Sequence, residues 1–243
     1  MNHFDKIDDP RRRWLIQALG AGYFCTLPMA QALAQVLGSR PEKLPEGRSI
    51  YRVQGGVLVD GKAATLQTPV TPTSTIETQA NGEIVYVQNQ NSYIQRGNSR
   101  VVLERAEKPE GGFAAGLRIV TGALLSVFPR GSPMTLKTKT ATVGIRGTGV
   151  YLEADEEQTY FCTCYGVADV SANEDPQSKD TVAASHHDRP LYILAKEPKG
   201  RNIRKAPFIN HTDQELMLIE TLVGRQPPFV FPKSDYSGPR RSY

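Results

Sequence analysis

Apolar and polar residues alternate along much of this chain with a period of two, which is typical of half-buried β-strands. The alternation predicts strands over residues 83–88, 92–96 and 99–104. Two turn-forming sequences, Asn89-Gln90-Asn91 and Gly97-Asn98, separate these three segments. This part of the chain is therefore expected to consist of short strands joined by tight turns.

The same kind of pattern continues on both sides of this region. Asp60-Gly61 follows the apolar residues 57–59 and is a strong hairpin signal. Farther along the chain, strands are predicted over residues 117–128 and 136–143. Many short strands at regular spacing, with little helical periodicity, predict a mainly β fold: a sandwich, roll or barrel, or a solenoid.

One short helix is expected near the C-terminus. Thr212 and Glu215 have the spacing of a capping box, in which each side chain bonds the backbone N–H of the other residue. Gly224 supplies the stop, because glycine readily adopts the left-handed conformation that ends helices. Between cap and stop lies one apolar stripe, formed by Leu216, Ile219, Leu222 and Val223.

The first residues have the pattern of a targeting segment. Arg11-Arg12-Arg13 precede an uncharged run over residues 14–39, and small-x-small cleavage sites lie within residues 30–34. We expect a signal peptide over residues 1–34, whose cleavage would leave no stable membrane anchor. The alternative is an uncleaved membrane anchor, which Gln, Gly and Pro within the run disfavour.

The leader is also similar to the twin-arginine export motif, through Arg11-Arg12-Arg13-Trp14-Leu15. Pro10 stands where that motif usually has Ser or Thr. Proteins that use this route are exported folded, which is usual for proteins that take up a cofactor before export. The general secretory route is the alternative. By either route, we expect the mature protein to be periplasmic or otherwise exported within the bacterial cell envelope.

Composition narrows the functional classes. Of the 243 residues, 39% are hydrophobic and 22% are charged, which is ordinary for a soluble globular protein. The net charge is +4, but the basic residues are dispersed and form no stripe interleaved with aromatic residues. We therefore expect no nucleic-acid partner.

Changes in composition divide the rest of the chain into four segments. Residues 35–47 are predicted to be a polar linker, and residues 48–170 the β domain. Residues 171–226 form a C-terminal extension that carries the predicted helix. Residues 227–243 are rich in proline and are expected to form a flexible tail.

Residues 136–152 read Leu-Lys-Thr-Lys-Thr-Ala-Thr-Val-Gly-Ile-Arg-Gly-Thr-Gly-Val-Tyr-Leu and resemble the closing strands of a FecR-type domain. In that family a Thr-rich strand leads through an Arg-Gly-Thr turn, here Arg146-Gly147-Thr148, into another strand. Upstream pieces are similar as well, namely Gly56-Val57-Leu58-Val59-Asp60-Gly61, Ile76-Glu77-Thr78 and the strand from Leu117 to Phe128. The resemblance covers residues 50–170.

FecR-type domains are extracytoplasmic β modules, best known from proteins that relay the occupancy of a transporter across the inner membrane to a sigma factor. The resemblance implies a β module of the cell envelope with another envelope protein as its partner. Only ten residues precede the three arginines, so direct control of a sigma factor is not expected. A binding, sensory or scaffold role is therefore expected, and not an enzymatic one.

Cysteine and histidine are rare in this chain and clustered. Apart from His3 and Cys25 in the leader, every Cys and His lies between residues 162 and 211. They form three groups, which are Cys162-Thr163-Cys164, His186-His187-Asp188 and His211. Thiolates and imidazoles are the ligands that hold zinc, copper or iron in proteins. The grouping therefore predicts a transition-metal site.

The spacing of the residues within each group indicates which side chains could bind the same ion. In a strand, Cys162 and Cys164 would point to the same face. His186 and His187 would point to opposite faces, so only one of them is expected to reach the ion. The predicted metal ligands are Cys162, Cys164, His187 and His211, with His186 and Asp188 as the less favoured candidates.

Three alternatives use the same residues. Cys162 and Cys164 could form a structural disulfide. If they instead form a reversible dithiol–disulfide pair, the chain would be a periplasmic redox protein. One of the cysteines could instead be a nucleophile with His187 as base and Asp188 as orienting group, although nothing in the surrounding sequence supports a thiol hydrolase. The predicted function is a non-enzymatic binding, sensory or scaffold protein with a Cys/His metal site.

Overall fold

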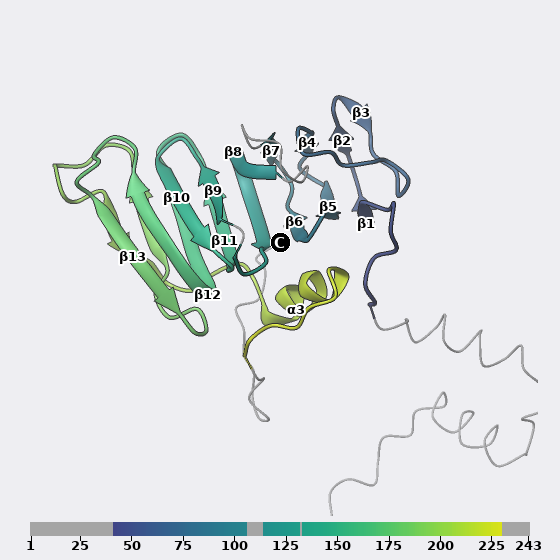
Figure 1. Ribbon diagram of the computed structural model, residues 1–243. Coiled ribbons are helices and arrows are strands. Elements are labelled where there is room, and N and C mark those ends of the chain that lie inside the picture. Colours follow the sequence, from purple (N-terminus) through teal and green to yellow (C-terminus); the bar gives the residue numbers. More distant parts are fainter. Residues whose placement is uncertain (1–40, 106–113, 132, 230–243) are drawn as a thin grey trace, which may run out of the picture. The chain divides into compact units, whose positions relative to one another are not determined.

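The computed structural model describes residues 41–105, 114–131 and 133–229, which are drawn in colour in Figure 1. This part of the chain is mainly β, with fifteen strands and one short helix near its C-terminal end, so the predicted fold class is confirmed. The elements are β1 (Ile50–Gln54), β2 (Val57–Val59), β3 (Lys62–Ala63), β4 (Thr75–Thr78), β5 (Glu83–Gln88), β6 (Asn91–Gln95), β7 (Arg100–Arg105), β8 (Ala114–Val127), β9 (Pro133–Lys137), β10 (Ala141–Arg146), β11 (Gly149–Ala154), β12 (Gln158–Ala172), β13 (Lys179–Ala184), β14 (Leu191–Leu194), β15 (Ile203–Lys205) and α3 (Asp213–Leu222).

The strands form two sheets that have β8 and β12 in common. The first sheet has the order β1-β5-β6-β8-β11-β12-β14-β15. The second sheet has the order β3-β2-β4-β7-β8-β9-β10-β12-β13. All neighbours in both sheets are antiparallel except β8 and β9, which are parallel. Because the two long strands run from one sheet into the other, the fifteen strands form one hydrogen-bonded network.

A glycine with positive φ marks the place where each long strand changes sheets. β8 pairs with β7 and β9 before Gly122, and with β6 and β11 after it. β12 pairs with β11 and β14 up to Tyr165, and with β10 and β13 beyond Gly166. The φ angles are 90° at Gly122 and 92° at Gly166. A Cβ atom would lie 2.0 Å from Ser99 Oγ at the first bend and 2.6 Å from Thr148 Cγ2 at the second, so both bends require glycine.

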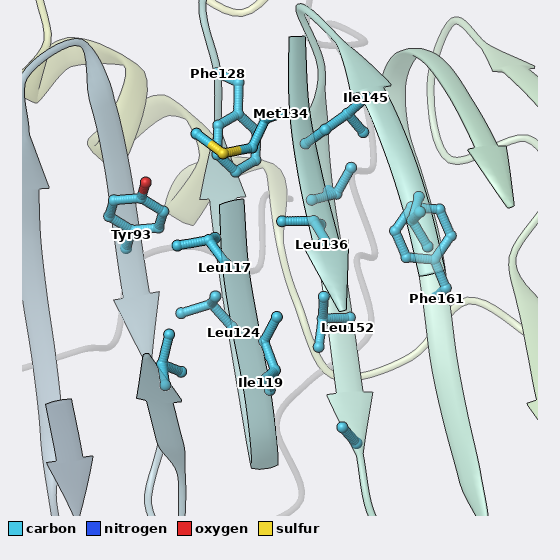
Figure 2. Packing of buried hydrophobic residues seen from close by; sticks show 14 of the residues in the cluster. Tyr93, Leu117, Ile119, Leu124, Phe128, Met134, Leu136, Ile145, Leu152 and Phe161 are labelled. Atoms are coloured by element: carbon cyan, nitrogen blue, oxygen red, sulfur yellow. The ribbon is translucent and has the colours of Figure 1, made fainter. Parts of the chain in front are cut away.

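The main hydrophobic core lies between the two sheets (Figure 2). Buried side chains from both sheets meet there, including Leu117, Leu124, Leu136, Leu152 and Phe161. A second cluster covers the other face of the first sheet, where α3 packs, and includes Val85, Ile94, Leu125, Leu216, Ile219 and Leu222. Successive residues of β12 alternate between these clusters, because side chains in a strand point to opposite faces in turn. Phe161 thus enters the core between the sheets, whereas Cys162 and Cys164 lie on the face that carries the helix.

The helix begins and ends as the sequence predicts. Thr212 is its N-cap, and the capping box is complete: the Thr212 hydroxyl accepts from the Glu215 N–H, and the Glu215 carboxylate accepts from the Thr212 N–H. Gly224 follows the helix with a φ of 73°. Glu215 also binds Arg96 at 2.9 Å, which ties the first turn of α3 to the end of β6. The start of the helix is therefore fixed relative to the first sheet.

Most of the predicted strands are present, but the strand predicted over residues 136–143 is wrong. The chain turns at residues 138–140, so that β9 and β10 form a hairpin. The turn is held by the Thr138 hydroxyl, which accepts from the Ala141 N–H at 2.9 Å. The Asn173 amide also donates to the carbonyls of Thr138 and Lys139 at 3.0 Å. Asn173 lies far along the chain, so the pattern around Thr138 does not reveal this contact.

The C-terminal extension is built into the same sheets as the rest of the fold. β13 pairs with the second half of β12, and β14 with the first half. Residue 170, where the sequence suggested a boundary, lies inside β12. The predicted signal peptide (1–34) and most of the predicted tail (227–243) lie outside the described residues. In the described ranges, no helix has the length and apolar character needed to cross a membrane.

Candidate metal centre

Three segments that are far apart in the sequence meet beside the start of α3. β12 supplies Cys162 and Cys164, the turn after β13 supplies His187, and the loop before α3 supplies His211. Each side chain offers one ligand atom, and the four atoms all lie within 4.8 Å of one another. The fold thus brings together the four side chains that the sequence singled out as metal ligands. We call this group the Cys2His2 cluster.

The spacing within the Cys2His2 cluster is close to that of a tetrahedral site. Cys162 Sγ is 3.5 Å from His187 Nδ1, and Cys164 Sγ is 3.4 Å from His211 Nε2. The two nitrogen atoms are 3.1 Å apart. Around zinc, with Zn–S near 2.3 Å and Zn–N near 2.0–2.1 Å, a tetrahedron separates nitrogen from sulfur by about 3.6 Å and two nitrogens by about 3.3 Å. The four atoms therefore fit around one ion with only small adjustments.

Each histidine is also held through the nitrogen that faces away from the cluster. His187 Nε2 lies 3.0 Å from Asp213 Oδ1, and His211 Nδ1 lies 2.7 Å from the Ile209 carbonyl oxygen. A carbonyl and a carboxylate accept hydrogen bonds, so each of these nitrogens carries the proton. With an ion bound, the lone pairs of His187 Nδ1 and His211 Nε2 would then be directed into the cluster. Metal-binding histidines commonly have such outer partners, which fix the tautomer and the orientation of the ring.

Aromatic rings surround the two histidines. The Tyr151 ring stacks on His211 with a centroid distance of 4.4 Å. The Phe208 ring lies 4.3 Å from His187 and 4.6 Å from His211, measured between centroids. This apolar shell limits the access of water, which strengthens the interaction of a bound cation with its ligands.

The segment His186-His187-Asp188 is not a strand, which corrects the sequence prediction. It is a tight turn, in which the Asp188 carboxylate accepts from the backbone N–H groups of Ser185 and His186 at 2.6 and 3.3 Å. His187 has a φ of 54°, so the alternating geometry of a strand does not apply. Both imidazoles therefore reach the same carboxylate, that of Asp213, instead of pointing to opposite faces.

The less favoured candidates lie outside the Cys2His2 cluster. The Asp188 carboxylate holds the turn through its bonds to Ser185 and His186. His186 lies outside the group of four, but its Nε2 atom is 2.8 Å from Asp213 Oδ2. His186, His187 and Asp213 form a second group whose ligand atoms lie within 4.8 Å of one another. His187 is thus the one residue shared by both groups.

Hydrogen bonds and burial together set the charges in the cluster. The hydrogen bond with Cys164, supported by those with the two histidines, lowers the pKa of Cys162 well below its usual value despite burial. Burial raises the pKa of Cys164. Burial also lowers the pKa of His187, but the hydrogen bonds to Asp213 and Cys162 outweigh this effect and raise the pKa to about 9. Without an ion, these shifts favour a Cys162 thiolate beside a protonated His187, whose positive charge a metal ion would replace.

Catalysis at the sulfur atoms is a poor fit to this geometry. Cys162, His187 and Asp213 form a line of contacts like that of a nucleophile, a base and an orienting acid, with Asp213 in the place that the sequence suggested for Asp188. However, Cys162 and Cys164 are free thiols with 0% exposure. A substrate would have to reach a sulfur atom that solvent does not reach. Ion binding needs no such access once the ion is in place.

Comparison with known proteins leaves the family of the chain open. No protein-family model matches the chain, and no curated protein matches it. Two crystal structures, at 2.50 and 1.65 Å resolution, of a "putative anti-sigma factor" from Parabacteroides distasonis are similar in part, with 13% sequence identity and TM-scores of 0.43 and 0.42. The similar region covers 54% of this chain and 58% of that protein, which is less than two thirds of its length.

Sequence reasoning identified the four clustered side chains but missed their surroundings. Asp213 and the aromatic residues Phe208 and Tyr151 are not among the side chains that the sequence assigned to the site. The signal for Asp213 was weak, because an acidic residue in the first turn of a helix is common for reasons unrelated to ligands. Its contacts with His186 and His187 exist only because the turn after β13 lies against the start of α3.

Proposed function

We propose that this chain is an exported, non-enzymatic β module whose Cys2His2 cluster binds one transition-metal ion. The observation that carries the proposal is the convergence of two buried sulfur and two buried nitrogen atoms within 4.8 Å. Both nitrogens have outer hydrogen-bond partners that direct their lone pairs into the cluster. A buried group of this kind is expensive to leave without a cation, because its polar atoms find few other partners.

Zinc is the ion that this arrangement suits best. Two thiolates and two imidazoles in a tetrahedral arrangement are a common ligand set of structural zinc sites. All four positions are filled by protein atoms, which leaves none for a substrate or a reactive water. Copper or iron would suggest sensing or electron transfer instead, so the identity of the bound ion is part of the test.

The ion would join the loop before α3 to β12 and to the turn after β13, which strand pairing already holds next to each other. Cys162 and Cys164 belong to β12, His187 to the turn after β13, and His211 to the loop before α3. A metal bound by all three segments would fix the loop and the helix on the first sheet. Metal binding and folding of this C-terminal part would then be coupled, as in other structural metal sites.

The role in the cell envelope is proposed from the sequence. The leader supports export, and the segment around Arg146-Gly147-Thr148 supports a relationship to FecR-type domains. We infer that the module binds another envelope protein, in a sensory or scaffold role. By fixing the C-terminal part of the module, the bound metal would stabilise the surface through which the module binds its partner. A pull-down of envelope proteins with the metal-loaded and the metal-free chain addresses this part of the proposal.

Metal analysis tests the site itself. The full chain purified without chelators is expected to contain close to one equivalent of metal, and Cys162→Ser to contain little or none. Cys25→Ser is the matched control, because it also removes one thiol but lies in the leader. If the wild-type chain carries no metal and Cys162 and Cys164 oxidise reversibly, the site is the dithiol–disulfide pair of a redox protein and the proposal is wrong.

A further inference from the structure

The ligand atoms of the Cys2His2 cluster are closed off from solvent. Cys162, Cys164 and His211 have 0% exposure, and the side chain of His187 has 5%. An ion from solution can reach these atoms only past a group nearer the surface. Because an unpaired cation is costly to bury, the ion needs ligands on the way in.

His186 and Asp213 have the position that such a path requires. The side chain of His186 is 38% exposed, and its Nε2 atom is 2.8 Å from Asp213 Oδ2. The other carboxylate oxygen of Asp213 is 3.0 Å from His187 Nε2. His187 Nδ1 in turn lies 3.5 Å from Cys162 Sγ. A continuous series of ligand atoms therefore leads from a partly exposed imidazole to the buried sulfur.

We propose that His186 and Asp213, together with His187, form a loading site that captures a divalent transition-metal ion and passes it to the Cys2His2 cluster. This inference rests on the proposed function, since it needs the cluster to bind metal. Imidazole and carboxylate are ligands that accept zinc or cobalt while the ion keeps some of its water. The three ligand atoms lie within 4.8 Å of one another, which allows them to share one ion.

His187 is the residue that makes the transfer possible. Its Nε2 atom faces the loading site, whereas its Nδ1 atom faces Cys162 and His211. In the transfer, the bonds from the ion to His186, Asp213 and His187 Nε2 break, and bonds to the two cysteines, His187 Nδ1 and His211 Nε2 form. Thiol protons pass to water as the thiolates bind, and the water molecules carried by the ion are released. On capture, the ion displaces the proton of His187 Nε2, which passes to water, and the other proton stays on Nδ1. In the transfer this second proton moves from Nδ1 to Nε2, where Asp213 accepts its hydrogen bond.

His186 could instead form only an ion pair with Asp213, and removing it would then affect the release of metal and not its uptake. If His186 only supported Asp213 and thereby His187, its loss would weaken the cluster, and metal would leave faster. If His186 is part of a loading site, its loss slows the uptake of metal and leaves the final metal content unchanged. The direction of the kinetic effect therefore separates the two roles.

The test measures uptake of cobalt(II) by the metal-free full chain in a stopped-flow instrument, because tetrahedral thiolate coordination of cobalt is visible in its absorption spectrum. His186→Ala is expected to slow uptake by about tenfold or more, the range in which a charged capture site raises association rates. The final absorbance is expected to equal that of the wild type. His186→Gln is the matched variant, because its amide can still donate a hydrogen bond to Asp213 but is a poor ligand.

The loading site is supported if both variants take up cobalt slowly and reach one equivalent. Uptake at the wild-type rate with full metal content in His186→Ala overturns the loading site and leaves the proposed function intact. Recovery of the wild-type rate in His186→Gln assigns His186 a hydrogen-bonding role only and also overturns the inference. Failure of the wild-type chain to bind cobalt overturns the proposed function, and the loading site with it.

Discussion

Single residues around the cluster differ in what they contribute. The two cysteines and two histidines supply ligand atoms, whereas Asp213 acts on the site through the histidines that it binds. Burial alone would raise the pKa of Asp213, but hydrogen bonds from His187 and His186 hold it below its usual value. The carboxylate is therefore ionised and can accept a strong hydrogen bond from His187 Nε2. Its negative charge also increases the basicity of the His187 nitrogen that faces the cysteines.

Asp213→Asn tests this contribution. The amide oxygen can still accept one hydrogen bond, but the negative charge is lost, so the affinity for zinc is expected to fall by about 10–100-fold. A competition titration with a chromophoric chelator measures this affinity. Asp169→Asn is the control, because Asp169 binds the exposed Arg146 and lies outside the two groups of ligand atoms. Unchanged zinc affinity in Asp213→Asn would show that the outer hydrogen bond does not tune the site.

At this scale, the sequence pointed to the four side chains that come together but not to the residues around them. Cys162, Cys164, His187 and His211 were recognisable because Cys and His are rare in the chain and their chemistry is specific. His187, and not His186, lies beside the cysteines, but alternation along a strand is not the cause. The two imidazoles differ because a turn with positive φ at His187 places them at different depths, and not because a strand alternates.

Among the elements, α3 connects the Cys2His2 cluster to the rest of the fold. Its first residue, Asp213, touches the histidines, and its apolar stripe packs on the first sheet. Near its C-terminal end, Glu220 accepts from the Tyr165 hydroxyl and binds Arg225 at 2.6 Å. The backbone N–H of Leu44 donates to the Leu222 carbonyl at 2.9 Å. Contacts at both ends thus hold the helix in place.

Removing a buried side chain of α3 measures how much the packing contributes. Leu216 has 0% exposure, so Leu216→Ala is expected to lower the free energy of unfolding by about 2–5 kcal/mol through lost burial and a residual cavity. The neighbouring Met217 is 38% exposed, so Met217→Ala is expected to change the free energy of unfolding by no more than about 0.5 kcal/mol. Urea unfolding of both variants provides the comparison. Equal stability of the two variants would mean that α3 does not pack on the sheet as described.

The elements also show where prediction from the sequence succeeds and where it fails. The helix was predictable because its signals are local: Thr212, Glu215 and Gly224 lie within or beside it. The strand β5 was predicted with its observed bounds, because its apolar residues 84–87 are β-formers and the turn-forming Asn89-Gln90-Asn91 follows directly. The turn at residues 138–140 was missed because Asn173, a distant residue, satisfies its carbonyl groups. Local patterns predict elements that local contacts determine.

At the scale of the whole described part of the chain, two features could not be predicted from the sequence of any single segment. One is the passage of β8 and β12 between the sheets, which depends on Gly122 and Gly166. Glycines are frequent in this sequence, and nothing local distinguishes a sheet-changing bend from a turn. The other is the meeting of β12, the turn after β13 and the loop before α3 at one point. Pairing of distant strands creates this point, so the sequence could suggest the ligands but not establish their convergence.

The central claim is that these three segments bind one ion through two sulfur and two nitrogen atoms. X-ray absorption spectroscopy at the zinc edge, on the full chain loaded with one equivalent of zinc, tests it most directly. The account predicts two sulfur neighbours near 2.3 Å and two nitrogen neighbours at about 2.0–2.1 Å. A first shell of nitrogen and oxygen alone, or of a single sulfur atom, would contradict the account.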